Sequence, residues 1–135
     1  LVINEEEARQ LSGKHHMIQV ANALLEMGPS TVVIKQGEYG AWLFAGEDVF
    51  SAPAFLLEAQ DPTGAGDTFA GGFLGYVAAK DSVDPKTLRS AVIHGSALAS
   101  FCVEGIGPAR LLEIDRAAID QRVSAFRNLV DFAHA

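Results

Sequence analysis

A glycine-rich segment, residues 61–67 (DPTGAGD), has the residue types and spacing needed to hold a phosphoryl group. Gly64 and Gly66 flank Ala65, so the backbone can adopt dihedral angles closed to other residues, and nothing larger than a methyl group blocks close approach. An apolar segment that predicts a helix follows from Asp67. The free N–H groups of residues 65–67 would then converge on one point with the helix dipole behind them, which predicts an anion hole.

Asp67 lies in the first turn of this predicted helix, beside the predicted anion hole. A carboxylate there can accept the proton of an incoming hydroxyl while the N–H groups hold the transferring phosphoryl group. An acidic residue in a first helical turn is also common because it complements the helix dipole, and glycines before a helix can be ordinary turn residues. The short glycine spacing alone therefore leaves both a catalytic and a purely structural interpretation open.

The elements that must position this segment are predicted by the hydrophobic pattern. The expected strands end near residue 3 and cover residues 31–35, 41–45 and 49–51, with a hairpin turn at 46–48. The expected helices cover residues 5–11, 15–27, 67–79 and 85–103, with a last helix from about residue 115. Strands followed by helices predict an α/β layered fold, in which ligands bind at the carboxyl ends of strands. The glycine turns 36–40 and 63–67 both follow extended segments and are therefore candidates for one site.

The 67–79 helix is apolar nearly all round, so we expect it to be buried. Its apolar core, residues 69–79, is too short to span a bilayer. The single cysteine, Cys102, excludes an intrachain disulfide and has apolar neighbours, which predicts a small buried side chain in a reducing compartment.

The composition is that of a globular protein, with 49% hydrophobic and 20% charged residues in a chain of 135, a length that suits one domain. The net charge is −7 and no basic patch is visible, which argues against a nucleic-acid partner. The first residues lack the basic start and apolar core of a signal peptide, so we expect a cytoplasmic protein with no membrane partner. The chain opens without an initiator Met on what reads as a strand end, which suggests that sequence precedes it.

The longer stretch 61–76 (DPTGAGDTFAGGFLGY) resembles the C-terminal signature of the ribokinase-like (PfkB-type) carbohydrate kinases. Further segments are similar to motifs of that family in its order and spacing: 4–7 (NEEE), 35–40 (KQGEYG), 93–99 (IHGSALA) and 105–107 (GIG). The resemblance implies a three-layer α/β/α ribokinase-like fold, of which residues 1–135 form the C-terminal, nucleotide-binding and catalytic-base portion. It also implies that the N-terminal portion, which carries the substrate site and a lid, is absent from these residues.

The resemblance implies a role for individual residues. Asp67 matches the catalytic base, and Gly64, Ala65 and Gly66 match the anion hole. The nucleotide-binding positions that it implies are Lys35, Gly37, Gly40, His94, Ala97 and Gly105. The metal positions that it implies are Asn4 and Glu7, which would hold Mg²⁺ through water, and Asp61, which would bind a monovalent cation such as K⁺.

Ordinary structural roles stay open for several of these residues. Asn4 and Glu7 could form a simple helix cap with a first-turn acid. Lys35 could be solvated, and His94 could be a packed side chain in a helix rich in small residues.

The implied activity is ATP- and Mg²⁺-dependent phosphorylation of a hydroxyl, with a primary alcohol of a sugar or nucleoside as the expected acceptor. The resemblance is also compatible with a homodimer of the full-length protein. Two alternatives keep the same fold: a non-catalytic nucleotide-binding or regulatory module, and a kinase of a vitamin-like alcohol. No G-x-x-x-x-G-K-[ST], H-R-D or D-F-G motif occurs, so P-loop and protein-kinase chemistry lack their motifs. We expect the 135-residue chain by itself to be inactive.

Overall fold

The computed structural model describes residues 1–106 and 109–133, and the chain forms two compact units, Leu1–Ala52 and Pro53–Ala135. The first unit contains all the strands of the sheet, and the second contains four helices. None of the helices within the described residues is long and apolar enough to cross a membrane.

The first unit is built on a four-stranded sheet in the order β1-β2-β3-β4. The strands are β1 (Val2–Asn4), β2 (Thr31–Lys35), β3 (Ala41–Ala45) and β4 (Asp48–Ala52). β1 and β2 are parallel, whereas β2, β3 and β4 form an antiparallel meander. The expected strands are confirmed, except that Asp48 pairs with Ala45 and belongs to β4 instead of the hairpin turn.

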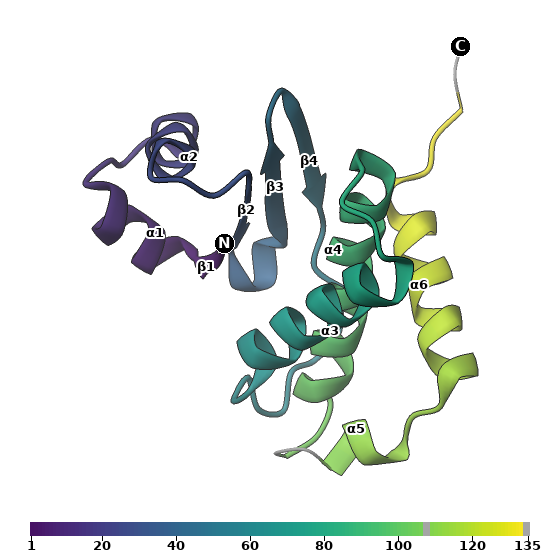
Figure 1. Cartoon of the computed structure of the whole chain (residues 1–135). Helices are drawn as coiled ribbons and strands as arrows, with labels where there is room; N and C mark the ends of the chain where they lie inside the picture. The colour runs from purple at the N-terminus through teal and green to yellow at the C-terminus, as the bar shows by residue number, and fades with distance from the viewer. Residues whose placement is uncertain (107–108, 134–135) are drawn as a thin grey trace. The chain divides into compact units, whose positions relative to one another are not determined.

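Two helices, α1 (Glu5–Ser12) and α2 (Met17–Glu26), lie along one face of this sheet (Figure 1). Their apolar side chains meet those of the strands in one core, in which Val20 and Leu24 of α2 and Val32 and Ile34 of β2 are fully buried. Trp42 of β3 is partly buried and packs against the same core. Val20 and Leu24 are four residues apart on one face of the helix, and Val32 and Ile34 are two residues apart on one face of the strand. Both pairs therefore point into the same core.

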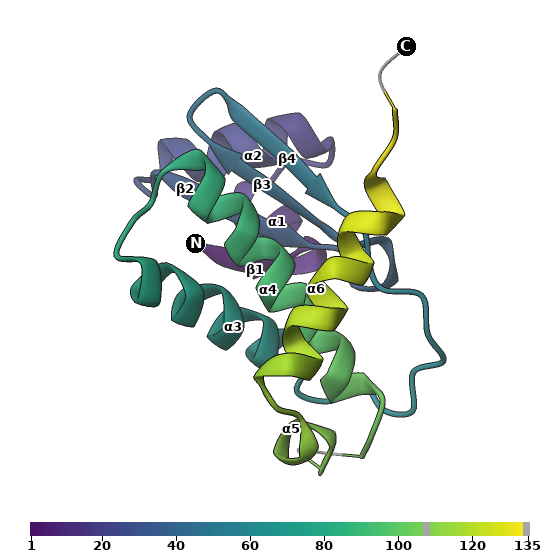
Figure 2. The same cartoon turned by 90° about the vertical axis from the view of Figure 1, so that its right-hand side faces the viewer.

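The second unit consists of helices α3 (Ala65–Lys80), α4 (Pro85–Val103), α5 (Ala109–Glu113) and α6 (Arg116–Val130). Figure 2 shows α3 and α6 on either side of α4, which contacts both. The expected starts of the last two long helices are confirmed by their caps: the Asp84 carboxylate accepts the Thr87 N–H, and the Asp115 carboxylate accepts the Ala118 N–H.

Close contact between α3 and α4 depends on glycine. A Cβ atom at Gly95 would lie 2.7 Å from the Phe69 carbonyl oxygen, and one at Gly72 would lie 3.0 Å from the Gly95 Cα atom. Any side chain at either position would therefore push the two backbones apart. On the other side of α4, Phe126 of α6 is fully buried and belongs to the core of the unit.

Two expectations about this unit need correction. The helix over 67–79 was expected to be buried, but only Phe69 and Phe73 of α3 are buried and Leu74 is 59% exposed. Its apolar composition comes largely from glycine and alanine, which let one side approach α4 closely without burying the other. α5 was not expected, because five residues are too few for a helical period to show. Gly107, which ends the family-like segment 105–107, and Pro108 are outside the described residues.

Candidate phosphate-binding site

Two successive turns carry the chain into α3. The Asp61 Oδ1 atom accepts the Thr63 N–H at 2.9 Å, and the Pro62 carbonyl accepts the Ala65 N–H at 3.1 Å. Gly64 then caps the helix in the left-handed region, with φ +83°. Glycine is required at this position because other residues reach such angles only at a cost. The segment before these turns has no regular structure from Pro53 onward, so the turn does not directly follow a strand.

The N–H groups at the start of α3 are only partly available to a ligand. The expectation that Ala65, Gly66 and Asp67 all present free N–H groups is wrong for Ala65, because its N–H closes the turn on Pro62. The N–H groups of Gly66 and Asp67 have no acceptor within the described residues. Two main-chain donors at a helix N-terminus therefore remain for an anion.

The Asp67 carboxylate lies in the first turn of α3, on an exposed side chain. The next residue fixes the turn: Thr68 donates its hydroxyl to the Gly64 carbonyl at 2.8 Å, and its N–H donates to the same oxygen at 2.9 Å. The structure therefore combines a solvent-accessible carboxylate and two available N–H groups in a single helical turn. This combination can accept a proton and stabilise negative charge at the same place.

The segment before the turn is held by the end of α4. The Val103 carbonyl accepts the N–H groups of Gln60 at 2.7 Å and of Asp61 at 3.4 Å. The Cys102 thiol donates to the Thr63 carbonyl at 3.5 Å. Cys102 is buried, as expected, but its contact with a residue 39 positions away was missed because nothing in the local sequence indicates it.

The Asp61 side chain is partly exposed, and its carboxylate is ionised at neutral pH. The hydrogen bond from the Thr63 N–H lowers the pKa of Asp61, and the Thr63 hydroxyl lowers it further. The negative charge is compatible with the monovalent-cation role implied by the resemblance, and that role remains a prediction.

In the first unit, the structure places two predicted residues side by side. Asn4 and Lys35 end the parallel strands β1 and β2 and are partners in the register of the sheet. The Asn4 Oδ1 atom accepts the Glu7 N–H at 2.8 Å, so Asn4 caps α1, while Glu7 itself is exposed. The structural interpretation of Asn4 is thus confirmed, and the magnesium role of Asn4 and Glu7 remains a prediction.

The expected glycine turn after β2 is one turn of 3₁₀-helix, Gly37–Tyr39. The Gln36 N–H donates to the Gly40 carbonyl at 2.8 Å and closes the turn. Gly37 has φ +57° and Gly40 has φ +98°, and a side chain would strain both angles. These glycines therefore have a backbone role that is independent of any nucleotide.

The remaining predicted nucleotide-binding residues lie on or just after α4. His94 is half-buried, its ring centroid is 4.3 Å from that of Tyr76, and its Nδ1 atom is 3.2 Å from the Ser90 carbonyl oxygen. The Ala97 side chain is fully buried, and its nucleotide-binding role remains a prediction. Gly105 follows the end of α4 and is partly exposed.

The described residues contain no group of three or more His, Cys, Asp or Glu side chains arranged to hold a metal ion. Magnesium does not require such a group, since it keeps several waters and commonly binds one or two carboxylates together with substrate phosphates. A single exposed carboxylate such as that of Glu7 fits this second mode.

Comparisons with known proteins identify relatives that are similar to most of the chain. The chain is 32% identical over 105 residues to the aminoimidazole riboside kinase of Salmonella typhimurium, covering 78% of this chain and 33% of that protein. It is 37% identical over 106 residues to a nucleoside kinase of Methanothermobacter thermautotrophicus, covering 72% of this chain and 32% of that protein. The chain thus spans about a third of the length of these curated relatives.

The fold is also that of solved kinases. The crystal structure of aminoimidazole riboside kinase from Salmonella enterica, complexed with aminoimidazole riboside and an ATP analogue, superposes with a TM-score of 0.79 and 29% identity. The superposition covers 90% of this chain and 41% of that one, which confirms the expected α/β ribokinase-like fold. The family model described as pfkB family carbohydrate kinase matches residues 1–115. The match includes the strands of the first unit and the glycine-rich turn of residues 61–67, and the chain is therefore a member of the pfkB family of carbohydrate kinases.

Proposed function

We propose that the protein containing this chain is an ATP-dependent phosphotransferase that passes the γ-phosphate to a hydroxyl of a sugar or nucleoside. The family is described as carbohydrate kinases, and the relatives include a nucleoside kinase and a riboside kinase. Both support a small hydroxylated acceptor, with a primary alcohol as the simplest choice.

The observation that carries the proposal is the first turn of α3. The N–H groups of Gly66 and Asp67 are available there, and the Asp67 carboxylate is exposed in the same turn. Phosphoryl transfer needs positioning, charge stabilisation and one group that orients the nucleophile, and this turn supplies candidates for the last two.

In the proposed reaction, the acceptor hydroxyl gives its proton to the Asp67 carboxylate while its oxygen forms a bond to the γ-phosphorus atom. The bond between that phosphorus and the bridging oxygen of ADP breaks, and ADP leaves with the electron pair. The main-chain N–H groups of residues 66 and 67 donate to the equatorial oxygens, on which negative charge is spread in the transition state. Asp67 thus acts as general base and the 64–67 turn as the anion hole, with Gly64 setting the backbone angle and Ala65 closing the turn.

The cofactor assignments belong to the same proposal. Glu7 and Asn4 would hold Mg²⁺ through water, and the ion would neutralise charge on the nucleotide phosphates. Asp61 would bind a monovalent cation such as K⁺. Nucleotide binding is assigned to Lys35, Gly37, Gly40, His94, Ala97 and Gly105.

The test is an Asp67→Asn variant of the catalytically active protein. The change is isosteric and leaves the main-chain donors in place, so nucleotide affinity should be nearly unchanged. Turnover should fall by roughly 10²–10⁴-fold, the usual range for a lost general base.

Asp81→Asn is a matched control at the other end of α3. Asp81 caps that end in the left-handed region at φ +49°, which asparagine also tolerates, so turnover should not change. Turnover of Asp67→Asn within about threefold of the unmodified protein would exclude Asp67 as the base. An unmodified protein that binds ATP but transfers no phosphate to any hydroxyl would instead favour the non-catalytic module.

A further inference from the structure

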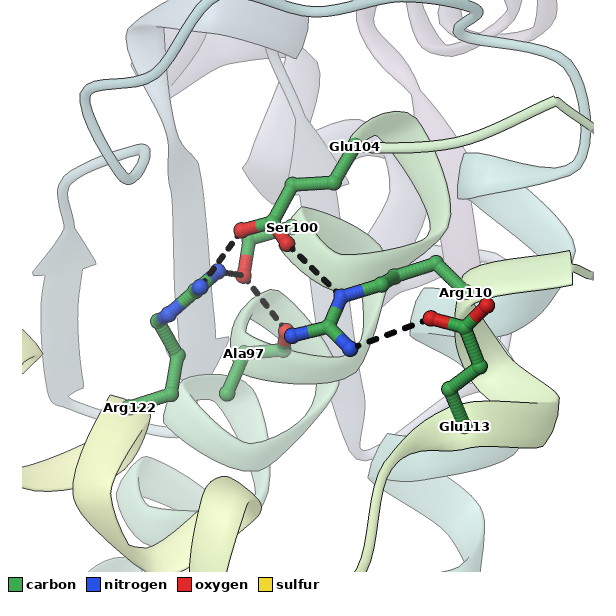
Figure 3. A network of polar contacts seen from close by, with 6 residues as sticks. All are labelled: Ala97, Ser100, Glu104, Arg110, Glu113 and Arg122. Atoms are coloured by element: carbon green, nitrogen blue, oxygen red, sulfur yellow. Dashed lines mark hydrogen bonds and ion pairs between the residues drawn. The ribbon is translucent and has the colours of Figure 1, made fainter.

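The guanidinium group of Arg122 joins two helices of the second unit (Figure 3). It extends from α6 and donates to the Ser100 hydroxyl of α4 at 2.6 Å and to the carboxylate of Glu104, the C-cap residue of α4, at 2.5 Å. The other oxygen of Glu104 accepts from Arg110 at 3.1 Å. The Arg122 side chain is only 14% exposed, so these contacts are held away from solvent screening.

The same guanidinium group also contacts the segment that leads to the phosphate-binding turn. It lies 4.4 Å from the ring centroid of Phe55 and 4.0 Å from that of Phe101, with both cation–π distances well inside 6 Å. The Phe55 ring in turn packs against Phe126, at 5.2 Å between centroids. Phe55 belongs to the irregular stretch between Pro53 and Gly64, so Arg122 anchors the first part of that stretch.

The last turn of α4 anchors the second part. Phe101 and Glu104 face Arg122, while the intervening Cys102 and Val103 hold Thr63, Gln60 and Asp61 by hydrogen bonds. Neighbouring residues at the end of α4 therefore hold both Arg122 of α6 and residues 60–63. A shift of this turn would move the carbonyl and thiol that fix residues 60–63, which stand directly before Gly64.

We propose that Arg122 is a positioning residue for the phosphate-binding turn: it fixes the last turn of α4 and the Phe55 ring, and through them the backbone of residues 60–64. The inference rests on the proposed function, since it assigns the turn to phosphoryl transfer. Positioning of this kind matters because a displacement of about 1 Å can reduce a rate by roughly 10²-fold.

The first variant is Arg122→Gln, which removes the charge and the planar stack but keeps a hydrogen-bonding side chain. The phosphotransferase rate per folded molecule should fall about 10- to 100-fold, because the N–H groups no longer meet the transferring group. The loss should appear in kcat, with the KM for ATP changed much less. A general loss of stability would instead reduce the amount of folded protein, measured by circular dichroism at the assay temperature, and leave kcat per folded molecule unchanged.

Cys102 provides a second measurement that does not depend on activity. Its buried thiol reacts with iodoacetamide only when the chain opens locally, and peptide mass spectrometry locates the label. In Arg122→Gln the labelling rate of Cys102 should rise about tenfold or more, because the contact between Cys102 and Thr63 opens more often.

Two further variants make the test specific. Phe55→Leu keeps an apolar side chain against Phe126 but removes the aromatic face, and it should change both kcat and labelling in the same direction by a smaller factor. Arg116→Gln is the matched control on the same helix, since Arg116 is 79% exposed and pairs only at the surface with Asp120. Neither measurement should change in this control.

Each outcome decides between the alternatives. A folded Arg122→Gln with kcat or Cys102 labelling within about twofold of the unmodified protein overturns the inference. If that variant does not fold, Phe55→Leu decides, and unchanged kcat or labelling there also overturns the inference. If labelling rises but even the unmodified protein transfers no phosphate, the proposed function fails while the anchoring of residues 60–64 by Arg122 stands.

Discussion

Asn4 illustrates how one side chain can have both a structural role and a candidate functional one. The side-chain Oδ1 atom of Asn4 caps α1 by accepting the Glu7 N–H. The family resemblance also assigns Asn4 a role in binding magnesium. The cap was predictable because Asn followed by a run of acids is typical of a helix start. The magnesium role was not derivable from that pattern, since the same residues occur at ordinary helix ends.

Substitutions at Asn4 separate the two roles. Asn4→Ala should lower the free energy of unfolding by about 1 kcal/mol because the Glu7 N–H loses its acceptor. Asn4→Ser retains a capping oxygen and should leave stability nearly unchanged. If Asn4 also serves the magnesium site, kcat should fall in both variants and the Mg²⁺ concentration for half-maximal rate should rise. Chemical denaturation and a magnesium titration measure the two effects, and a serine variant with unchanged magnesium dependence would leave Asn4 with its capping role alone.

Residue-level prediction succeeded where the local sequence contains the physical cause. Gly64, Gly37 and Gly40 were expected in turns and have positive φ angles there. It failed where the cause lies far along the chain: the engagement of the Ala65 N–H depends on how the Pro62 turn closes, and the anchor formed by Cys102 and Val103 is about 40 residues from the segment it holds.

At the scale of elements, the contact between α3 and α4 is set by glycines. Gly95→Ala should lower the free energy of unfolding by about 1–3 kcal/mol, because the new methyl group would meet the Phe69 carbonyl oxygen. Gly75→Ala is the control in the same pair of helices, since a Cβ atom there meets nothing within 4 Å. It should raise stability by about 0.5–1 kcal/mol through helix propensity. Thermal unfolding of both variants measures the difference, and equal effects would show that the close approach of the backbones is not required.

The same pair of helices contains a histidine whose pKa is shifted. Burial lowers the pKa of His94, and its hydrogen bond to the Ser90 carbonyl opposes this only partly. Charges from Lys80 of α3 and from Arg116 and Asp120 of α6 contribute less. The unfolded chain therefore binds the proton more readily than the folded one does.

Stability should consequently be greatest above the unfolded pKa of about 6.5 and fall as the pH drops below it towards the lower folded pKa. His94→Phe retains a ring against Tyr76 and cannot titrate, so its stability should depend less on pH in this window. Denaturant midpoints at several pH values between 5 and 8 measure the effect. Parallel pH curves for the two proteins would assign the dependence to other groups.

The ion pairs of Glu104, the C-cap residue of α4, depend on pH in the same direction as His94 but for a different reason. Burial alone would raise the pKa of Glu104, but hydrogen bonds from Arg122 and Arg110 outweigh it, and the pKa is lowered. The ion pairs formed by Glu104 are therefore present at neutral pH, and their contribution to stability is lost as the pH falls through the lowered pKa of Glu104.

The elements themselves were largely predictable, since β2 and α4 have the bounds that their hydrophobic period and flanking caps indicate. The extent to which α3 is buried was not predictable. An apolar composition on all sides shows that a helix can be buried, but it does not show how many of its sides other elements cover. α5 is too short to produce a period at all.

At the scale of the whole molecule, the chain corresponds to about a third of each curated relative. The 135 residues expressed by themselves should bind Mg²⁺–ATP weakly and show no sugar- or nucleoside-dependent release of ADP. Holding the hydroxyl in line with the γ-phosphate can supply about 7–11 kcal/mol, and no described residue is assigned to that task. An assay with ATP, Mg²⁺ and a panel of sugars and nucleosides measures this, and ADP release that depends on one of them would show that these residues suffice.

The donors proposed for the phosphate are main-chain groups, so no exchange of side chains can delete them. A substitution of Gly66 changes the size of the side chain and the allowed backbone angles. The main-chain N–H of residue 66 remains unless the new residue is proline. A mutational survey that truncates side chains would therefore detect this turn only through its shape, above all through the positive φ of Gly64. During evolution the backbone conformation of the 64–67 turn must therefore be kept, while the side chains around the turn can be replaced.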